Sequence, residues 1–428
     1  MLALGWPCHA DVPVPISIND FHEFDAKKAK IGQLLFYDKI LSGNRNISCG
    51  TCHHHDLGGS DGLSLGIGEG GEGLGKDRTG GSGNDRIKKR IPRNSPGLWN
   101  LGHKDIKVLF HDGRLEVSEL YGNGFNSPAE EWLPDGLETI LAAQALFPLV
   151  AQFEMAGNPK ENDIAGAIHD RIDAAWPIIA KRVRTIPEYG AMFVDAFDTV
   201  QTPEDVTIVD VANSLAAFMG TEWQSLDSPF DQWLAGKGEL SRDAHAGMDV
   251  FFGKGNCASC HSGPLFTDQK FHALLLPAFG PGRTRAFDPI PRDVGRMGET
   301  DKLDDAYRFR TPSLRNVALT APYGHNGAFP TLYSVIEYHT DPRKHLKLWS
   351  RDQAQLPPVP WLADIDFVVT ADIREMTRQR ATLDLRPIPL SSAEIQQLVV
   401  FLQNLTGVSS GSPPLGKPNS VPSGLPVD

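Results

Sequence analysis

Two short motifs of the same form carry the clearest chemical signal in the sequence. The first reads CGTCH and ends at His53, and the second reads CASCH and ends at His261, so both are C-x-x-C-H. Two thiols at this spacing form thioether bonds to the two vinyl groups of one haem, and the following histidine then binds the iron. The sequence therefore predicts two c-type haems, held by the residues Cys49, Cys52, His53, Cys257, Cys260 and His261.

Two other interpretations of the cysteine motifs stay open at this point. A redox dithiol also has C-x-x-C spacing, but it does not need a histidine after both copies. A four-cysteine zinc site would have to join two distant pairs, and it would leave the repeated histidine without a role. Haem attachment uses both histidines, and we favour it. The fifth cysteine, Cys8, lies in a segment that we expect to be removed.

The composition is that of a globular chain with an acidic balance. Of the 428 residues, 40% are hydrophobic and 22% are charged, and 41 basic against 53 acidic side chains give a net charge of −12. An acidic balance argues against a nucleic-acid partner, which needs a basic face. The sequence has no run of eighteen apolar residues, so no membrane span is predicted.

Helical patterns surround the motifs, and no stretch favours strands, so we predict a mainly α fold with long loops. Pro148 is expected to stop one helix, and Thr202 is expected to cap another with Pro203 at its first position. Residues 58–84 are rich in glycine and are predicted to form a long functional loop. The expected helices cover residues 21–39, 138–146, 203–219, 241–252 and 392–405.

The two halves of the chain are predicted to be related by an internal repeat. Each half has a helix, a cysteine loop and a Gly/Pro-rich stretch, and the segment RNSPGLWN of the first half resembles RTPSLRNV of the second. We expect two cytochrome c-like haem domains, over residues 16–230 and 231–407. Residues 1–15 are expected to be a signal-peptide remnant or a frayed terminus, and residues 408–428 a disordered tail.

Six sequence blocks make a resemblance to a known family specific. ISCGTCH, RNSP, HDGR, AQALFPLVAQFEM, GKGNCASCHSGPLF and TPSLRNVALTAPYGHNG follow one another in the family's order. The chain resembles the bacterial dihaem cytochrome c peroxidases, which include the MauG-type enzymes that oxidise partner proteins. The resemblance implies an exported, periplasmic oxidoreductase. Its N-terminal haem would react with hydrogen peroxide, and its C-terminal haem would relay or store oxidising equivalents.

Two residues of the first half match the peroxide pocket of that family. Gln144 and Glu154 stand ten residues apart in its Q-x-x-x-P…E-M pattern. Splitting the O–O bond needs one group that moves a proton and one donor that orients the peroxide. We therefore predict that Glu154 shuttles the proton and that Gln144 holds the oxygen. A solvated loop carboxylate is the alternative interpretation of Glu154.

The ligand positions at both irons depart from those of typical peroxidases. Those enzymes carry a second histidine sixteen residues after the first proximal histidine, where this chain has Glu69. We therefore expect the first iron to be open at rest, as in MauG-type members. At the second haem, peroxidases have methionine and MauG-type enzymes tyrosine, but here that position falls on His339, with Tyr338 as its rival. The predicted helix places His339 on the apolar face of Leu332, Val335 and Ile336; a solvent-facing histidine is the alternative.

The resemblance also implies a calcium ion between the domains. The matching ligand positions are Asn94, Thr320 and Pro322, and oxygen ligands suit calcium. The tryptophan that relatives often place between the haems is replaced by His111 in this chain. Trp99 and Trp132 are the two candidates to take its role, and a core position is the alternative for both. Residues 121–135 are an insertion relative to the family, of the kind that shapes access or partner choice.

Three functions are consistent with these features. The first is peroxide reduction with electrons from a small donor protein, a cytochrome c or a cupredoxin. The second is MauG-like oxidation of a partner protein, and the third is electron transfer without catalysis. Gln144 and Glu154 argue against the third function, whereas Glu69 and His339 lean toward the second. A homodimer is also compatible with the sequence.

Overall fold

The structure is a computed structural model that describes residues 12–284, 288 and 290–428. It confirms the predicted helix-rich fold, in which strands are few and short. Cys8 and most of the expected signal-peptide remnant lie outside the described residues. Among the residues that are described, no helix combines the length and the apolar character that a membrane crossing requires.

The first half of the chain contains seven α-helices within its described residues. Their bounds are α1 Ala26–Tyr37, α2 Cys49–Cys52, α3 Ile140–Leu149, α4 Asp163–Ala167, α5 Trp176–Arg184, α6 Pro187–Ala196 and α7 Ile208–Glu222. The bounds of the later helices are α8 Pro229–Leu234, α9 Arg242–Phe252, α10 Met297–Thr300, α11 Leu332–Thr340, α12 Pro342–His345, α13 Val368–Ala371, α14 Ile373–Ala381 and α15 Ser392–Gln403.

Two small antiparallel sheets complete the regular structure of the described residues. The strands β1 Val108–Leu109, β2 Leu115–Val117 and β3 Phe125–Asn126 form one sheet in this order. The strands β4 Phe271–His272 and β5 Phe309–Arg310 form the other, in which Phe271 pairs with Arg310.

The predicted helices are found, with corrections to their ends. The first helix, expected from residue 21, begins at Ala26, because the side chain of Asp25 caps it by accepting from the backbone N–H groups of Lys27 and Lys28. The helix α3 continues through Pro148 to Leu149, because a proline in the last turn removes a single hydrogen bond of the ladder. The helix α7 begins five residues later than expected. Thr202 caps only a short 3₁₀ turn, and Thr207 forms a second capping box with Asp210 that starts the helix proper.

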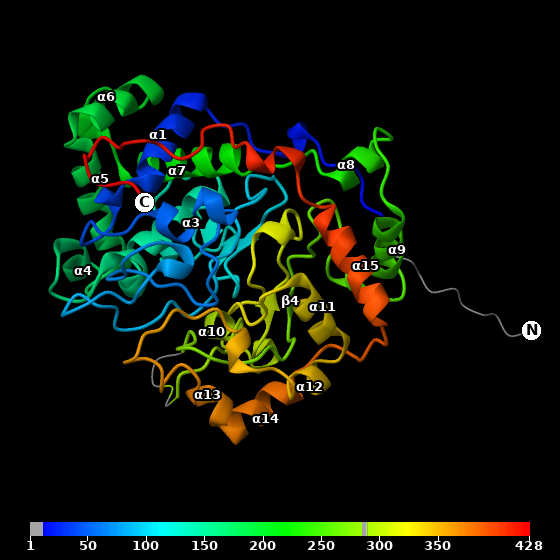
Figure 1. The fold of residues 1–428 in the computed structure, drawn as a ribbon. Coiled ribbons are helices and arrows are strands. Elements are labelled where there is room, and N and C mark those ends of the chain that lie inside the picture. Colours follow the sequence, from blue (N-terminus) through cyan, green and yellow to red (C-terminus); the bar gives the residue numbers. More distant parts are fainter. Residues whose placement is uncertain (1–11, 285–287, 289) are drawn as a thin grey trace, which may run out of the picture.

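The buried apolar side chains gather in two main clusters. The larger one uses residues between 16 and 223, joined by Leu265 and Val421. The other uses residues between 230 and 405. In Figure 1, α1 lies along α7 within the first cluster and α9 lies along α15 within the second. The residues of the first cluster largely precede residue 230 and those of the second begin there. The two domains and the internal repeat stay predictions.

The C-terminal segment does not have the disorder that we predicted from its Ser, Pro and Gly content. It runs from the end of α15 back along the first half, near α1 (Figure 1). The side-chain amide of Gln33 donates to the carbonyls of Leu415 and Gly416 at 2.8 and 2.7 Å. At the end of the segment, Asp428 forms an ion pair with Lys39 at 2.6 Å. The amino-acid composition did not predict an ordered C-terminal segment. The contacts that order it use its backbone groups and side chains of the first half, which its own composition does not reveal.

Candidate active site

The first cysteine motif forms the short helix α2 and orients the histidine that follows it. The Nδ1 atom of His53 lies 3.0 Å from the carbonyl oxygen of Gly59, to which it donates. A neutral ring with its proton on Nδ1 has a lone pair on Nε2, which is the form that binds iron. Burial lowers the pKa of His53 and so favours this neutral form.

The second motif orients its histidine in the same way. The Nδ1 atom of His261 donates to the carbonyl oxygen of Phe266 at 3.0 Å. Burial lowers the pKa of His261 to about 4. Both motifs thus offer two thiols and a neutral imidazole whose orientation a backbone carbonyl fixes, as c-type haem attachment requires.

The structure disfavours both alternatives to haem attachment. Burial raises the pKa of the thiols of Cys49, Cys52 and Cys257 to about 12, whereas redox-active dithiols have a lowered pKa. The four motif cysteines also do not converge on one metal site. Within the described ranges, the one group of potential metal ligands consists of Cys260, Asp268 and His272.

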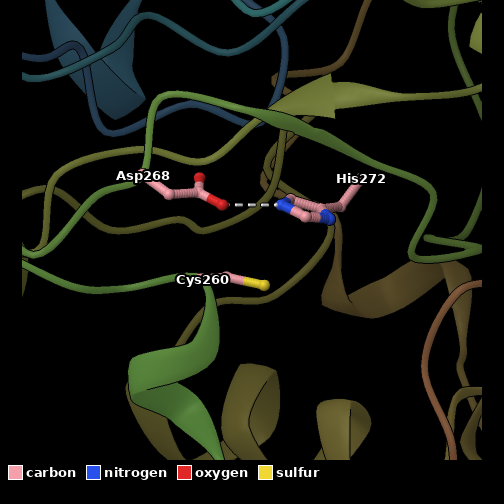
Figure 2. Close-up of side chains that lie close together, drawn as sticks. All are labelled: Cys260, Asp268 and His272. Carbon is pink, nitrogen blue, oxygen red and sulfur yellow. Dashed lines mark hydrogen bonds and ion pairs between the residues drawn. The ribbon is translucent and has the colours of Figure 1, made fainter. Parts of the chain in front are cut away.

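These three side chains lie together beside the second motif (Figure 2). The Asp268 carboxylate accepts a hydrogen bond from Nε2 of His272 at 3.0 Å, and the three potential ligand atoms lie within 4.8 Å of one another. Once haem is attached, the sulfur of Cys260 is a thioether and no longer a thiolate ligand. The group is therefore part of the haem site, and His272 forms part of the wall described next.

A cavity of about 370 Å³ opens beside the second motif. Both cysteines and the histidine of the motif contribute to its lining, as do apolar side chains of α15. The apolar face predicted for α11 is confirmed, because all four of its residues line the cavity: Leu332, Val335, Ile336 and His339.

His339 and its rival have different surroundings. The Nδ1 atom of His339 donates to the carbonyl of Val335 at 2.6 Å, which leaves Nε2 for a metal. Tyr338 is fully buried against Phe329, and its hydroxyl donates to the carbonyl of Leu275. The cavity wall therefore contains His339 rather than Tyr338, while iron binding by His339 stays a prediction.

The predicted peroxide residues lie on adjoining elements of the first half. Gln144 belongs to α3, and Glu154 belongs to a single π-turn, Gln152–Ala156, that contacts α3. Such turns are frequent at functional sites. Burial raises the pKa of Glu154, and the nearby charges of Arg114 and Arg283 oppose part of that shift. A half-buried carboxyl with this environment differs from the solvated loop residue of the alternative interpretation.

Glu69, at the position where typical peroxidases carry a second histidine, accepts hydrogen bonds from other side chains. Only 6% of it is exposed, and its carboxylate accepts from the side-chain amides of Asn44 and Asn46 at 2.7 and 2.8 Å. Its backbone N–H donates to the carbonyl of Glu154 at 3.0 Å. The loop with Glu69 thus helps to fix the turn with Glu154.

Two charged residues near the first cysteine motif belong to no motif that can be recognised in the sequence. Asp61 is 2% exposed, and burial raises its pKa to about 7. Arg78 is also buried, and it donates to backbone carbonyls, including that of Ile67 at 2.6 Å. The charges of both residues act on the thiol of Cys52. In the sequence, these two residues could be found only through their position in the glycine-rich loop at 58–84. Their placement near Cys52 supports the functional role predicted for that loop.

The two tryptophan candidates for the region between the motifs differ in burial. The indole N–H of Trp99 donates to the carbonyl of Gly58 at 2.9 Å, and its ring lines the cavity at the second motif. Trp132 is 47% exposed and stacks on Arg171 at the surface. Trp99 therefore joins the loop after the first motif to the second site, whereas Trp132 does not. His111 also lines the cavity, and its Nε2 donates to a backbone carbonyl at 3.1 Å.

The three predicted calcium ligands lie along this same cavity. Asn94, Thr320 and Pro322 all belong to its lining. The side-chain amide of Asn94 donates to the carbonyl of Leu63 at 2.8 Å. The structure thus brings the three residues to one region, and calcium binding there stays a prediction.

Comparison with known proteins places the chain among dihaem enzymes. The model of the di-haem cytochrome c peroxidase family matches residues 26–239. The methylamine utilization protein MauG of Methylorubrum extorquens is 29% identical over 314 residues, which cover 73% of this chain and 68% of that protein. The cytochrome-c peroxidase IdrP1 of Denitromonas iodatirespirans is 29% identical over 348 residues, or 76% of this chain and 75% of the relative.

A solved structure supports the fold. The crystal structure of a MauG-like protein associated with microbial copper homeostasis aligns with a TM-score of 0.60 and 24% identity, over 98% of this chain and 99% of that one. The family model covers half of the chain, and the two motifs fit covalent haem in their thiols, their imidazoles and the apolar cavity beside the second. The chain therefore belongs to the di-haem cytochrome c peroxidase family, and it is a peroxidase-type oxidoreductase with two c-type haems.

Proposed function

We propose that this enzyme reduces hydrogen peroxide at the haem of the first motif, while the haem of the second motif relays or stores oxidising equivalents. Each haem, when bound, supplies an iron that exchanges electrons. The observation that carries the proposal is the position of Glu154. The turn that contains Glu154 is hydrogen-bonded to the segments on both sides of the first motif, since Gly43 N–H donates to the carbonyl of Met155 at 2.8 Å and Glu69 N–H to that of Glu154 at 3.0 Å. Burial raises the pKa of Glu154.

Glu154 and Gln144 divide the work on peroxide in this proposal. The Glu154 carboxylate would take the proton from one oxygen of the peroxide and return it to the other, which leaves as water. The Gln144 amide donates a hydrogen bond that orients the peroxide. A pKa raised above that of an ordinary glutamate suits both halves of this transfer, because the group must accept the proton and then release it.

The second haem is proposed to have two imidazole ligands, His261 and His339. Both rings donate Nδ1–H to backbone carbonyls, and both contribute to the lining of one cavity. A His/His haem has a lower reduction potential than a His/Met haem. Such a centre is a poor acceptor from high-potential donors and a good store for oxidising equivalents. Trp99 is the proposed link between the two haems.

We further propose that each half of the chain holds one haem, over residues 16–230 and 231–407. The two clusters of buried apolar residues support this division. Calcium at Asn94, Thr320 and Pro322 and export to the periplasm complete the proposal. Export fits because haem is attached to C-x-x-C-H motifs outside the cytoplasm.

A second candidate function is MauG-like oxidation of a partner protein. The observation in its favour is Glu69, which stands where typical peroxidases carry a second histidine. Its carboxylate accepts hydrogen bonds from two asparagines. Steady-state peroxide turnover with a reduced cytochrome c or cupredoxin tests the two candidates. Fast turnover supports peroxide reduction. Slow turnover with a long-lived oxidised state supports partner oxidation, and no reaction with peroxide overturns both.

The open first iron gives a prediction for the resting protein. With no histidine at position 69, the fully oxidised enzyme is expected to show one high-spin and one low-spin ferric haem. It is also expected to react with peroxide without prior reduction. Electron paramagnetic resonance measures the spin states, and stopped-flow absorbance measures the reaction. Two low-spin haems with no high-spin signal would contradict the prediction.

A further inference from the structure

Three arginines line the cavity beside the second motif, and they differ in their partners. Arg292 forms an ion pair with Glu375 at 3.1 Å, and Arg315 forms one with Asp231 at 2.6 Å. Arg310 lines the same cavity, yet among the described residues no carboxylate forms an ion pair with it. Its side chain instead donates to two backbone carbonyls, that of Phe110 at 3.1 Å and that of Thr311 at 3.3 Å.

The lack of an anionic partner makes Arg310 unusual for its position. Burial lowers the pKa of Arg310 to about 10, and no neighbouring charge opposes that effect. Two carbonyl contacts leave part of the five-donor guanidinium fork unused. Burying a charged group is costly unless it is paired and fully hydrogen-bonded. A partner from outside the polypeptide, with a negative charge, would complete this environment.

A second donor, His325, also lines this cavity. The ring of His325 stacks on Phe309, the residue before Arg310, with centroids 3.6 Å apart and an interplanar angle of 6°. Its Nδ1 atom is buried and has no hydrogen-bond partner within the described part of the chain. An imidazole ring carries at least one N–H, so His325 can donate to a ligand in the cavity that it lines. Arg310 and His325 therefore offer a cation and an N–H donor to the cavity that both line.

We propose that Arg310, assisted by His325, binds a propionate carboxylate of the second haem and thereby raises the reduction potential of that haem. A haem brings two carboxylates, and the guanidinium fork matches carboxylate geometry. The cavity that Arg310 lines is the one that contains Cys257, Cys260 and His261, so the second haem is the one concerned. This inference needs the two haems but not the roles of Glu154 and Gln144.

Arg310 also connects the two halves of the chain. Its backbone N–H donates to the carbonyl of His111 at 2.8 Å, and its side chain donates to that of Phe110. The residue therefore joins β5 of the second half to a loop of the first half, beside the residue that replaces the family's relay tryptophan. The proposed contact between Arg310 and the propionate therefore lies at the junction of the two halves. There the charge of Arg310 acts on electron exchange between the haems.

Reduction potentials of both haems, measured by spectroelectrochemical titration, test the proposal. Arg310→Gln leaves the propionate charge uncompensated, which stabilises the more positive oxidised iron. We expect the reduction equilibrium constant of the second haem to fall about tenfold, or about 59 mV for one electron. The first haem should change much less. Arg310→Lys keeps the charge and should restore most of the potential.

Arg308→Gln is the matched control. Arg308 lies two residues earlier, pairs with Asp384 at 3.1 Å and does not line the cavity, so its loss removes the same charge without a propionate contact. Equal shifts in the Arg308 and Arg310 variants, or unchanged potentials in Arg310→Gln, overturn the proposal. If Arg310→Gln fails to load the second haem, the reduction potential of the second haem in His325→Phe tests the proposal instead. It keeps the stack on Phe309, and an unchanged second potential in it then overturns the proposal.

Discussion

Glu154→Gln is expected to slow the peroxide-induced absorbance change of the oxidised enzyme by about 10²–10⁴-fold, the usual contribution of a general acid–base group. The substitution keeps the size of the side chain and its capacity for hydrogen bonds, but it removes the carboxylate that accepts a proton. Both haems and the resting spectrum should be retained. Stopped-flow mixing with peroxide measures the rate.

The pH dependence of this rate adds a second test of the same residue. Transfer begins with the deprotonated carboxylate, so the wild-type rate should rise as the pH rises through the pKa of Glu154. Because burial raises that pKa, the rise should lie above the range of an ordinary glutamate. In Glu154→Gln this step in the profile should disappear.

Glu161→Gln is the control for the loss of one carboxylate near this turn. Glu161 is exposed, and its carboxylate accepts from the backbone and side chain of Asn158 at 2.8 Å. Its substitution should leave the peroxide rate unchanged. Equal rates in wild type and Glu154→Gln would show that Glu154 does not transfer the proton.

The presence of two c-type haems was the most predictable feature of this molecule. Thioether attachment needs a fixed spacing of cysteine and histidine in one short segment, and such a spacing is visible in a sequence. The helical period likewise predicted that Leu332, Val335, Ile336 and His339 share a face, and all four line the cavity. In both cases the constraint is local in the chain.

The surroundings of the sites were not predictable in this way. Arg310 and His325 come from separate segments and line one cavity, and the stack of His325 on Phe309 is a contact between segments that no local pattern encodes. Asp61 and Arg78 were hidden in a loop whose glycines carry no side-chain pattern. The tail at 408–428 was misjudged for a related reason, since its order depends on Gln33, far away in the sequence.

The second large effect is expected for His339→Ala, which should convert the low-spin ferric signal of the second haem to high spin. Removal of the imidazole leaves that iron with His261 as its one protein ligand, and a five-coordinate or weakly ligated ferric haem is high-spin. The peroxide reaction at the first haem should survive, because Gln144 and Glu154 are untouched. Electron paramagnetic resonance on the oxidised variant measures the change.

Two companion variants separate the coordination role of His339 from a packing role. His339→Met should keep the low-spin state and raise the reduction potential of the second haem, since His/Met ligation has the higher potential. Tyr338→Phe removes a buried hydroxyl that donates to the carbonyl of Leu275, and it should leave the spectrum unchanged. A low-spin signal that persists in His339→Ala but is lost in Tyr338→Phe would make Tyr338 the ligand. Because Tyr338 is packed against Phe329 while His339 lines the cavity, we expect the opposite result.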